Sequence, residues 1–466
     1  MITRRALLQN ATRVGALSAS GALGSLLHAW QSVPAPPDPR LIVRSRRPQD
    51  LETSVGLLTD WITPNGVFFV RSHLPTPSVE QGTWTLSVAG SVDRPRTFDF
   101  DELGSLERVA STVTLECAGN GRAFFDPPVA GVQWQKGAVG NARWTGVRLA
   151  DVLKRAGVRA SGQFVLLDGA DRPVGTVPDF ARTLPMAKAL HPDTLLAFEM
   201  NGAPLPVAHG CPVRVIVPGW EGAYWVKWLT RIEVLDGQHD GFFVQTAYRY
   251  PTRSVAPGSV VPANAMEPLT GLTVKSLIVT PGDGTSLPVG RLRVAGFAWA
   301  GEAEVARVDV STNDGKSWQR TSLGPDRERY AWRAFEYEWR GIPAGTFTVM
   351  ARAVDSRGRV QNDAPPWNPS GYLWNAPDRV TVTIGVPATP GKRPEIVDPG
   401  LPSDADTPLV RQECVVCHDS DLIAQQRLDE AGWSREIDKM TRWGASLTAD
   451  ERARLLGYLV RHFPPR

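Results

Sequence analysis

The chain has 466 residues, 42% of them hydrophobic and 21% charged, with 51 Lys and Arg against 48 Asp and Glu. This composition supports sizeable cores and excludes a disordered chain. The formal net charge of +3 argues against a protein that coats nucleic acid or an anionic membrane. No apolar run reaches the ~18 residues of a membrane span, and four Cys are too few for a disulfide scaffold.

Residues 1–33 predict an export signal. Arg4 and Arg5 precede a short apolar stretch rich in Ala and Gly, which is typical of a signal peptide rather than of a spanning helix. The paired arginines indicate the twin-Arg route, which exports folded proteins. We therefore expect a periplasmic protein without a membrane span in its mature form. A basic N-terminal arm or a misread start codon is the alternative.

Residues 34–260 are expected to form an α+β domain. Alternating apolar residues predict strands at 84–89 and 213–217. An amphipathic helix is predicted at 149–156, and Gly157 is expected to end it. Unusual residues cluster in this part of the chain, so we expect the chemistry to lie here.

Residues 261–386 predict an all-β, immunoglobulin-like sandwich, because short strands recur at regular spacing. Strands are predicted at 273–279, 291–299, 305–312, 331–339, 346–354 and 379–384. Asn313-Asp314-Gly315 is a hairpin signal between two of them. A domain of this kind is usually a scaffold or an interface.

The last two segments differ in composition. Prolines without a hydrophobic period mark residues 387–408 as a semi-rigid linker. Residues 409–466 predict a small all-α domain, in which Thr448 and Glu451 form a capping box at the start of an amphipathic helix.

Cys414-Val415-Val416-Cys417-His418 is a C-x-x-C-H motif at the start of this helical domain. Such a motif attaches a c-type haem: the two thiols form thioethers, and the imidazole is the proximal iron ligand. We therefore expect covalent haem c in a cytochrome c domain. A redox-active thiol pair or a disulfide is the alternative.

The sixth iron ligand is bounded by elimination. After His418, the soft or imidazole candidates are Met440 and His462. Met440 precedes a Trp-Gly turn, whereas His462 follows the last predicted helix. We expect Met440 to be the ligand, because methionine raises the haem potential as suits an electron acceptor. The alternative is that Met440 is a core residue.

A single Cys follows an apolar strand in Leu115-Glu116-Cys117-Ala118-Gly119-Asn120-Gly121-Arg122. Glycines allow close backbone approach to a bound group, and a nearby Arg favours the thiolate, a nucleophile or soft metal ligand. A buried, inert Cys is the alternative from this residue alone.

This loop resembles that of the sulfite oxidase family of molybdenum enzymes. The resemblance continues through the segments 68–73, 142–149, 204–219 and 226–229 and covers about residues 50–385. It implies that 34–260 is a molybdopterin-binding domain, that Cys117 binds molybdenum, and that 261–386 mediates dimerisation, which predicts a homodimer.

The resemblance also implies the roles of other residues. Four match positions that hold the pterin and its phosphate: His73, His209, Arg214 and Lys227. Four match substrate-pocket positions: Arg71, Arg122, Trp134 and Tyr248, the last with Tyr250 as a rival. Guanidinium groups bind oxyanions, and a Tyr hydroxyl donates a hydrogen bond or passes a proton.

One position departs from the family. Sulfite-oxidising members carry an Arg near the end of the sandwich, where this chain has Ser370. The loss of that charge puts sulfite in doubt and brings the chain closer to the sulfane dehydrogenases, which oxidise protein-bound sulfur. Cys211 is expected to be a buried hydrophobic residue.

The sequence thus predicts a periplasmic molybdenum–haem dehydrogenase for sulfite or a sulfur-carrier protein, with a soluble cytochrome c or terminal oxidase as electron acceptor. The linker would let the haem domain move. The alternatives are a protein-sulfoxide reductase of the same fold and, from another class, a non-catalytic haem electron carrier. Nitrate reduction is disfavoured by the export signal.

Overall fold

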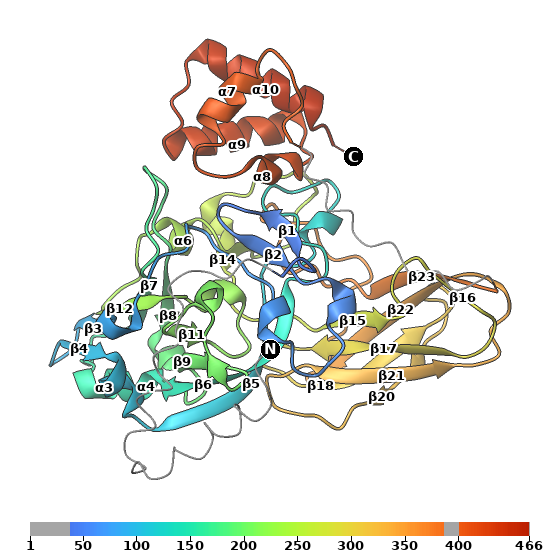
Figure 1. Cartoon of the computed structure of the whole chain (residues 1–466), viewed down its shortest axis with the longest axis horizontal. Coiled ribbons are helices and arrows are strands. Elements are labelled where there is room, and N and C mark those ends of the chain that lie inside the picture. The colour runs from blue at the N-terminus through green and yellow to red at the C-terminus, as the bar shows by residue number, and fades with distance from the viewer. Residues whose placement is uncertain (1–37, 386–399, 466) are drawn as a thin grey trace, which may run out of the picture.

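The computed structural model describes residues 38–385 and 400–465. Figure 1 shows an α+β domain, an elongated β-sandwich and a group of short helices above them. The expected signal, residues 1–33, and most of the expected linker lie outside the described residues. In the described ranges, no helix has the length and apolar character needed to cross a membrane.

Two five-stranded sheets share one core in the α+β domain. The first has the order β4–β3–β12–β7–β8, namely Arg96–Asp99, Thr85–Gly90, Leu229–Leu235, Phe164–Gly169 and Ala181–Pro185. The second has the order β10–β9–β6–β5, with β11 also paired to β9; these are Ala203–Pro204, Leu195–Met200, Val139–Arg148, Arg108–Glu116 and Arg214–Ile216. A separate hairpin joins β1 and β2, Ile42–Ser45 and Asp50–Glu52.

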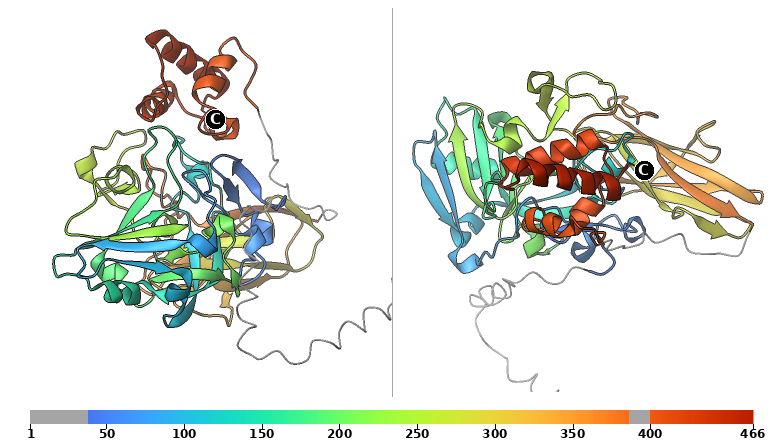
Figure 2. Two further views of the ribbon diagram at one scale, coloured as in Figure 1. Left: turned by 60° about the vertical axis from the view of Figure 1, so that its left-hand side comes forward. Right: turned by 90° about the horizontal axis from the view of Figure 1, so that it is seen from above.

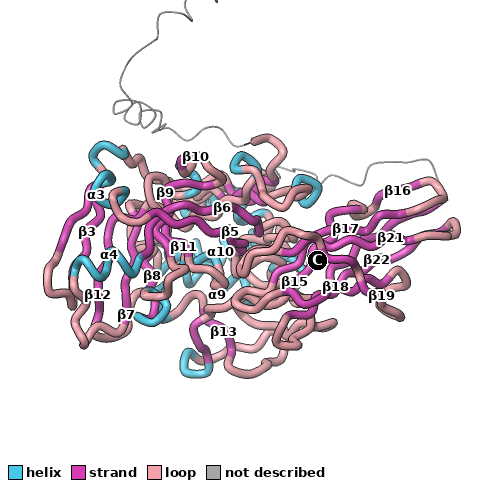
Figure 3. The backbone as a smooth tube through the Cα atoms, turned by 90° about the horizontal axis from the view of Figure 1, so that it is seen from below, coloured by secondary structure: helices cyan, strands magenta, loops and turns pink. Residues whose placement is uncertain are grey.

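Helices are short in this domain, as the tube in Figure 3 makes clear. Leu149–Ala156 forms α4, as predicted, and buries its apolar side chains. Gly157 ends it with a φ of 73°, a left-handed conformation that glycine adopts without steric cost. The remaining helices, α3, α5 and α6, are Phe100–Gly104, Met186–Ala189 and Phe242–Gln245.

The β-sandwich has one sheet of order β15–β17–β21–β20 and a second of order β16–β23–β22–β18–β19. The bounds of the six predicted strands agree with the structure to within two residues. In chain order, β15 to β23 are Lys275–Thr280, Thr285–Leu287, Leu292–Trp299, Val305–Ser311, Gln319–Arg320, Ser322–Leu323, Arg333–Trp339, Gly345–Asp355 and Asp378–Ile384. Strands β16, β19 and β20 were not predicted, because two or three residues carry no readable alternation.

The expected boundary between these two domains, at 260/261, is too early. A hairpin pairs β13 with β14, Arg249–Pro251 with Met266–Pro268, so the chain up to Pro268 stays with the α+β domain. The domains then join along β5: the Thr114 amide donates to the Tyr330 carbonyl at 3.0 Å, and the Trp332 amide donates to Thr114 Oγ1 at 2.8 Å.

The C-terminal part is all-α, as predicted. Its helices α7 to α10 are Thr407–Glu413, Ser420–Ala424, Glu430–Arg442 and Ala449–His462, and their core includes Val410, Trp433 and Tyr458. The capping box at the start of α10 is confirmed, with Thr448 and Glu451 each bonding the other's backbone N–H. We call residues 400–465 the helical module.

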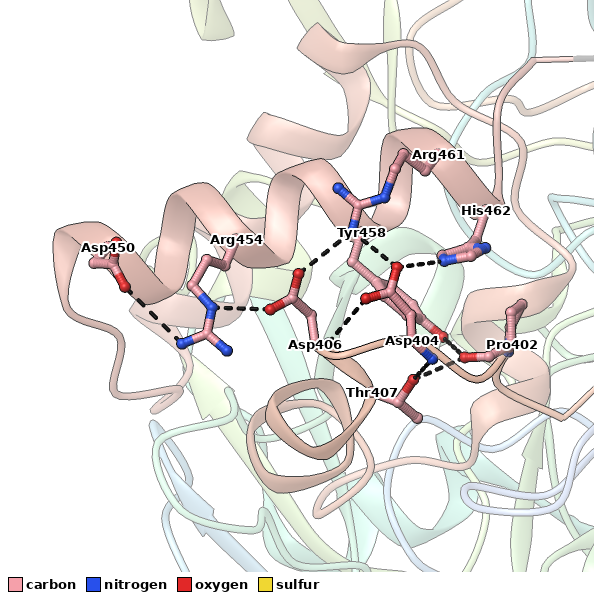
Figure 4. Close-up of polar contacts among 9 residues, drawn as sticks. All are labelled: Pro402, Asp404, Asp406, Thr407, Asp450, Arg454, Tyr458, Arg461 and His462. Carbon is pink, nitrogen blue, oxygen red and sulfur yellow. Dashed lines mark hydrogen bonds and ion pairs between the residues drawn. The ribbon is translucent and has the colours of Figure 1, made fainter.

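The expected linker end, residue 408, is also wrong. The described residues from 400 onward pack on α10, so they belong to the helical module. Tyr458 donates its hydroxyl to the Pro402 carbonyl at 2.7 Å. The Asp404 carboxylate lies 2.9 Å from both Arg461 Nη2 and His462 Nε2, as Figure 4 shows. These contacts give the segment a fixed conformation despite its prolines.

The helical module rests on the α+β domain, and α8 is its nearest helix to β1 (Figures 1 and 2). Ion pairs cross the interface: Arg47 Nε lies 2.9 Å from Asp419 Oδ1, and Arg46 Nη1 lies 3.3 Å from Asp421 Oδ2. Phe242 and Trp443 meet edge to face with centroids 5.4 Å apart. The module is therefore docked over the part of the domain that carries Cys117.

Candidate active site

Two adjoining cavities contain the residues of chemical interest. The smaller, of about 60 Å³, is lined by Cys117 together with Arg71, His73, His209, Arg214, Lys227 and Tyr248. The larger, of about 440 Å³, lies between the α+β domain and the helical module; its lining includes Arg71, His73, Cys117, Arg122, Trp134, Tyr248, Cys414, Cys417, His418 and Met440. The structure thus brings together every predicted site residue in two neighbouring spaces.

Cys117 directly follows the last residue of β5. Its amide donates to the Ala138 carbonyl at 2.9 Å, and its carbonyl accepts from the Asn120 amide at 2.9 Å, which sets the turn. Burial raises the pKa of the Cys117 thiol to about 11, while Arg71 and Arg122 oppose that shift. The two guanidinium groups favour the thiolate form, and a bound metal cation would favour it further. Cys117 is therefore suited to be a metal ligand.

Arg122 offers a positive charge to the larger cavity. Its Nη1 donates to the Val132 carbonyl at 3.0 Å and its Nη2 to the Ser370 carbonyl at 3.2 Å. Among the described residues no carboxylate pairs with it and its Nε has no hydrogen-bond partner. A Cβ at Gly119 or Gly371 would come within 2.8 Å of the guanidinium, so both glycines are needed for its placement.

Arg71 has a different environment. Its Nη1 lies 3.0 Å from Oδ1 of Asp50, a carboxylate that is only 1% exposed. Burial alone would lower the pKa of Arg71. The negative charge of Asp50, with smaller contributions from Tyr248 and Cys117, outweighs burial, and the pKa of Arg71 is raised. Arg71 is therefore a fixed, permanently charged group at the junction of the two cavities.

Tyr248 and His73 form a polar pair beside Cys117. The Tyr248 hydroxyl lies 2.6 Å from His73 Nε2, and the His73 ring stacks on Phe180 at a centroid distance of 3.9 Å. Burial, then the charge of Arg71, holds the pKa of His73 well below its usual value, so the imidazole is neutral. Tyr250 lines neither cavity, so the geometry favours Tyr248 as the pocket tyrosine.

Three further basic side chains line the smaller cavity, namely His209, Arg214 and Lys227. Arg214 donates to the carbonyls of His209 and Trp225 at 2.9 and 3.1 Å, and among the described residues its Nε has no partner. Lys227 Nζ donates to Ser72 Oγ at 2.9 Å and to the Ala208 carbonyl at 3.0 Å. No carboxylate in the described ranges forms an ion pair with Arg214 or Lys227.

Burial dominates the electrostatics of this basic group. It lowers the pKa of Arg214 to about 9, that of Lys227 to about 7 and that of His209 to about 3. Buried cations are stable when an anion compensates them. The unpaired Nε of Arg214 and the depressed pKa values therefore fit a site for an anionic cofactor such as a pterin phosphate.

Trp134 and Ser370 complete the wall of the larger cavity near Arg122. Trp134 is fully buried, yet in the described part of the chain its Nε1 has no hydrogen-bond partner. Ser370 lies there too, its Oγ donating to the Arg249 carbonyl at 3.1 Å. Cys211, by contrast, is 4% exposed and packs in the core; burial raises the pKa of its thiol to about 12.

The C-x-x-C-H residues face the larger cavity from the helical module. His418 Nδ1 lies 3.1 Å from the Asp419 carbonyl, a bond that requires the proton on Nδ1 and leaves the Nε2 lone pair available. Met440 lines the same cavity, as do the apolar Ile437, Leu455 and Leu459. His462 does not; it is held by Asp404.

Some residues around the site had no signal in the sequence analysis. The buried Glu221 lies 3.9 Å from Arg182, whose guanidinium is 5.0 Å from the Tyr248 ring centroid; burial raises the pKa of Glu221 to about 7. Asp50 was missed as well. Neither Gly219-Trp220-Glu221 nor Asp50 at the start of β2 forms a recognisable motif. The partners of these two carboxylates, Arg182 and Arg71, are far away in the sequence.

Comparison with known proteins identifies the family. The model for the oxidoreductase molybdopterin binding domain matches residues 73–243, and that for the Mo-co oxidoreductase dimerisation domain matches 267–385. Human mitochondrial sulfite oxidase is 38% identical over 74% of this chain, which spans 66% of the human protein's length. Sulfite oxidase of Arabidopsis thaliana is 33% identical, with 75% of this chain and 95% of the plant protein covered.

A solved structure extends the likeness. The sulfane dehydrogenase SoxCD from Paracoccus pantotrophus aligns with a TM-score of 0.63 and 26% identity, covering 82% of this chain and 97% of the other. The two family models and the relatives agree on the region that holds Cys117 and the basic cavity. The chain therefore belongs to the sulfite oxidase family and is a molybdopterin oxidoreductase.

Proposed function

We propose that this protein is a molybdenum- and haem-dependent dehydrogenase that oxidises an inorganic sulfur compound and passes the electrons through a c-type haem to an external cytochrome. The observation that carries the proposal is the larger cavity, which is lined by Cys117 on one side and by Cys414, Cys417 and His418 on the other. The proposed redox site and the proposed electron-transfer site would thus share one space.

The smaller cavity would hold the molybdenum cofactor. His73, His209, Arg214 and Lys227 provide donors and charge for the pterin and its phosphate, and the Cys117 thiolate would bind the metal. When bound, this cofactor supplies two-electron redox chemistry at the substrate sulfur. The protein contributes orientation, charge and the exclusion of competing ligands.

Arg122, Arg71 and Tyr248 would bind the substrate anion. The guanidinium of Arg122 lacks a carboxylate partner within the described ranges, so its charge is available to an oxyanion. The Tyr248 hydroxyl and the neutral His73 are placed to hold or move a proton between them. For sulfite the balance is one sulfite and one water giving one sulfate, two protons and two electrons.

Cys414 and Cys417 would hold haem by two thioether bonds, and His418 and Met440 would bind its iron. The available Nε2 of His418, the apolar lining and the position of Met440 in the cavity support this assignment. When bound, a haem would supply one-electron transfer chemistry. A soluble cytochrome c or a terminal oxidase is the proposed acceptor.

The remaining predictions are part of the same proposal. The twin-Arg sequence supports export to the periplasm, and the match to a dimerisation domain supports a homodimer. The domain order would be signal 1–33, molybdopterin-binding domain, sandwich, linker and cytochrome domain.

A second substrate has a specific observation in its favour. Ser370 replaces the expected arginine at the cavity wall, and the solved structure with a TM-score of 0.63 is a sulfane dehydrogenase. Sulfane sulfur on a carrier protein is therefore the second candidate. Sulfoxide reduction is less favoured, because the proposed c-type haem would carry electrons away from the metal site to an external acceptor.

The test is anaerobic mixing of the purified protein with sulfite while the haem absorbance is followed. Molybdenum and haem contents are measured beforehand, and Cys117→Ala is the control. Rapid haem reduction in the wild type alone supports sulfite oxidation. No reduction in protein loaded with both groups refutes sulfite, and the same experiment is then made with a sulfur-carrier protein bearing sulfane sulfur.

A further inference from the structure

The loop Gly131–Trp134 lies between Arg122 and the helical module. On its inner side, the Val132 carbonyl accepts from Arg122 Nη1 at 3.0 Å, and the Trp134 carbonyl accepts from the Ala123 amide at 3.1 Å. The positions of Arg122 and of Trp134, both predicted to line the substrate pocket, thus depend on this one loop.

Two glutamines that directly follow α8 hold the outer side of the same loop. Gln425 Oε1 accepts from the Gln133 amide at 2.8 Å, and Gln426 Oε1 accepts from the Gly131 amide at 3.2 Å. These bonds satisfy alternate backbone N–H groups, as a neighbouring strand would do. The loop is thereby fixed between the module and Arg122.

The glutamines are themselves fixed. Gln425 Nε2 donates to the Arg44 carbonyl of β1 at 2.6 Å, and Gln426 Nε2 donates to the Leu422 carbonyl of α8 at 2.9 Å. Gln426 is only 7% exposed. Each amide therefore uses both its donor and its acceptor, so its orientation is determined by its surroundings.

These contacts differ in kind from the ion pairs of the same interface. Arg46 and Arg47 have side-chain exposures of 49% and 60%, so salt screens their attraction to Asp421 and Asp419. The charged pairs can guide docking, since each joins an arginine of the α+β domain to a carboxylate of the module. The two glutamine amides, by contrast, bond directly to the backbone of Gly131 and Gln133.

We propose that Gln425 and Gln426 are positioning residues for the anion site, so that docking of the helical module and binding of the substrate oxyanion are coupled. The inference rests on the proposed function for the assignment of Arg122 to the substrate. With the module docked, the loop holds Arg122 toward the cavity; when it leaves, the Gly131 and Gln133 amides lose their partners. Coupling is reciprocal, so a bound oxyanion also stabilises the docked module.

The experiment uses the full-length, oxidised protein loaded with both groups, and sulfate as the probe. Calorimetric titration compares the wild type with Gln425→Met/Gln426→Met, which keeps side-chain length and removes the acceptors. We expect sulfate to bind about tenfold more weakly to the variant, within the usual range of coupling between sites. Gln412→Met is the matched control, because Gln412 is exposed on α7 and its side chain donates to its neighbour Glu413 at 2.9 Å.

A second readout separates positioning from electron transfer. In stopped-flow reduction by sulfite, positioning raises the concentration at half-saturation, whereas a mere docking role lowers the limiting rate alone. Unchanged sulfate affinity and half-saturation in the double variant overturn the inference and leave the proposed function intact. A tenfold sulfate shift in a protein that no sulfur compound reduces overturns the proposed function instead. Gln425→Met alone, at a half-buried position, serves if the double variant does not fold.

Discussion

Lys275 of the β-sandwich and Glu116 of the α+β domain form a buried ion pair, with Nζ 2.6 Å from Oε1. Glu116 also accepts from Trp299 Nε1 at 2.7 Å and from Asn120 Nδ2 at 2.9 Å, and it directly precedes Cys117. The second domain therefore reaches the strand end that presents the thiol. Its role is not confined to dimerisation, because two of its side chains set the start of the Cys117 turn.

Removal of this pair is expected to destabilise the protein. Lys275→Met leaves Glu116 buried without its cation, and breaking a buried pair in this way costs about 3–5 kcal/mol. We expect the free energy of unfolding to fall by ~3 kcal/mol, the low end of that range, because Asn120 and Trp299 still donate to Glu116. Urea unfolding of the loaded protein measures the change. The double variant Lys275→Met/Glu116→Gln should recover part of the loss, and equal loss in both variants would contradict the argument.

Tyr248 and Tyr250 give a matched pair of substitutions. Tyr248→Phe removes the hydroxyl that lies 2.6 Å from His73 Nε2, so kcat/KM should fall roughly 10²-fold, as is typical when a group that positions or transfers a proton is lost. Tyr250→Phe should have little effect, because Tyr250 lines neither cavity. Steady-state rates with the accepted sulfur substrate test this, and similar losses in the two variants would refute the assignment.

Ser370 stands where sulfite-oxidising members of the family carry an arginine, so the anion site is expected to bind sulfite weakly for lack of that charge. Ser370→Arg adds a guanidinium at the cavity wall while the backbone carbonyl that Arg122 uses is retained. A charge-assisted hydrogen bond contributes about 1.5–3 kcal/mol, so KM for sulfite should fall at least about tenfold. Ser370→Gln, of similar reach but neutral, is the control. No change in KM for the arginine variant would show that residue 370 does not face the anion.

The buried Lys227 predicts a pH dependence that differs between cofactor-free and loaded protein. Its pKa is about 7 in the folded chain and ~10.4 when unfolded, so between these values the folded state binds fewer protons. The stability of cofactor-free protein should therefore rise with pH from 7 toward 10, by at most about 1.4 kcal/mol per pH unit.

An anionic cofactor compensates the charge of Lys227 and should flatten this slope. Thermal unfolding across pH 7 to 9, with protein from cells that lack the cofactor, makes the comparison. Lys227→Met should remove the extra slope from the cofactor-free protein. Identical slopes in the cofactor-free and loaded wild type would mean that no anion occupies the basic cavity.

The haem assignment separates Met440 from His462. Met440→Ala should lower the reduction potential and change the visible spectrum of the haem, because a methionine ligand raises the potential. His462→Ala should leave both unchanged, since Asp404 holds that imidazole away from the cavity. Redox titration followed by absorbance checks both variants, and a potential altered by His462→Ala alone would reverse the assignment.

Local patterns predicted local structure well. The helix at 149–156, the capping box at Thr448 and the longer sandwich strands follow from periodicity and capping, which are properties of neighbouring residues. Strand β11, Arg214–Ile216, is shorter than predicted and buried at every residue, since both of its faces are covered. Alternation in the sequence did not reveal that.

Pairings between distant residues could not be predicted in the same way. Asp50 is recognisable as a partner only after the fold brings it to Arg71, and the two glutamines after α8 resemble any polar helix end until they meet the loop at Gly131. The predicted linker end failed for the same reason: Asp404 is unremarkable in a proline-rich stretch, and its partners Arg461 and His462 are more than fifty residues later.

The contacts of Asp404 and Pro402 with α10 have a mechanical consequence. The chain enters the helical module at residue 400 and is fastened within a few residues to the helix that ends it. A pull on the entering chain is therefore shared between the last turn of α10 and the start of α7, because Thr407 Oγ1 also donates to the Pro402 carbonyl at 2.8 Å. Two helices thus carry the load together, so the module can be drawn away from the α+β domain as one unit.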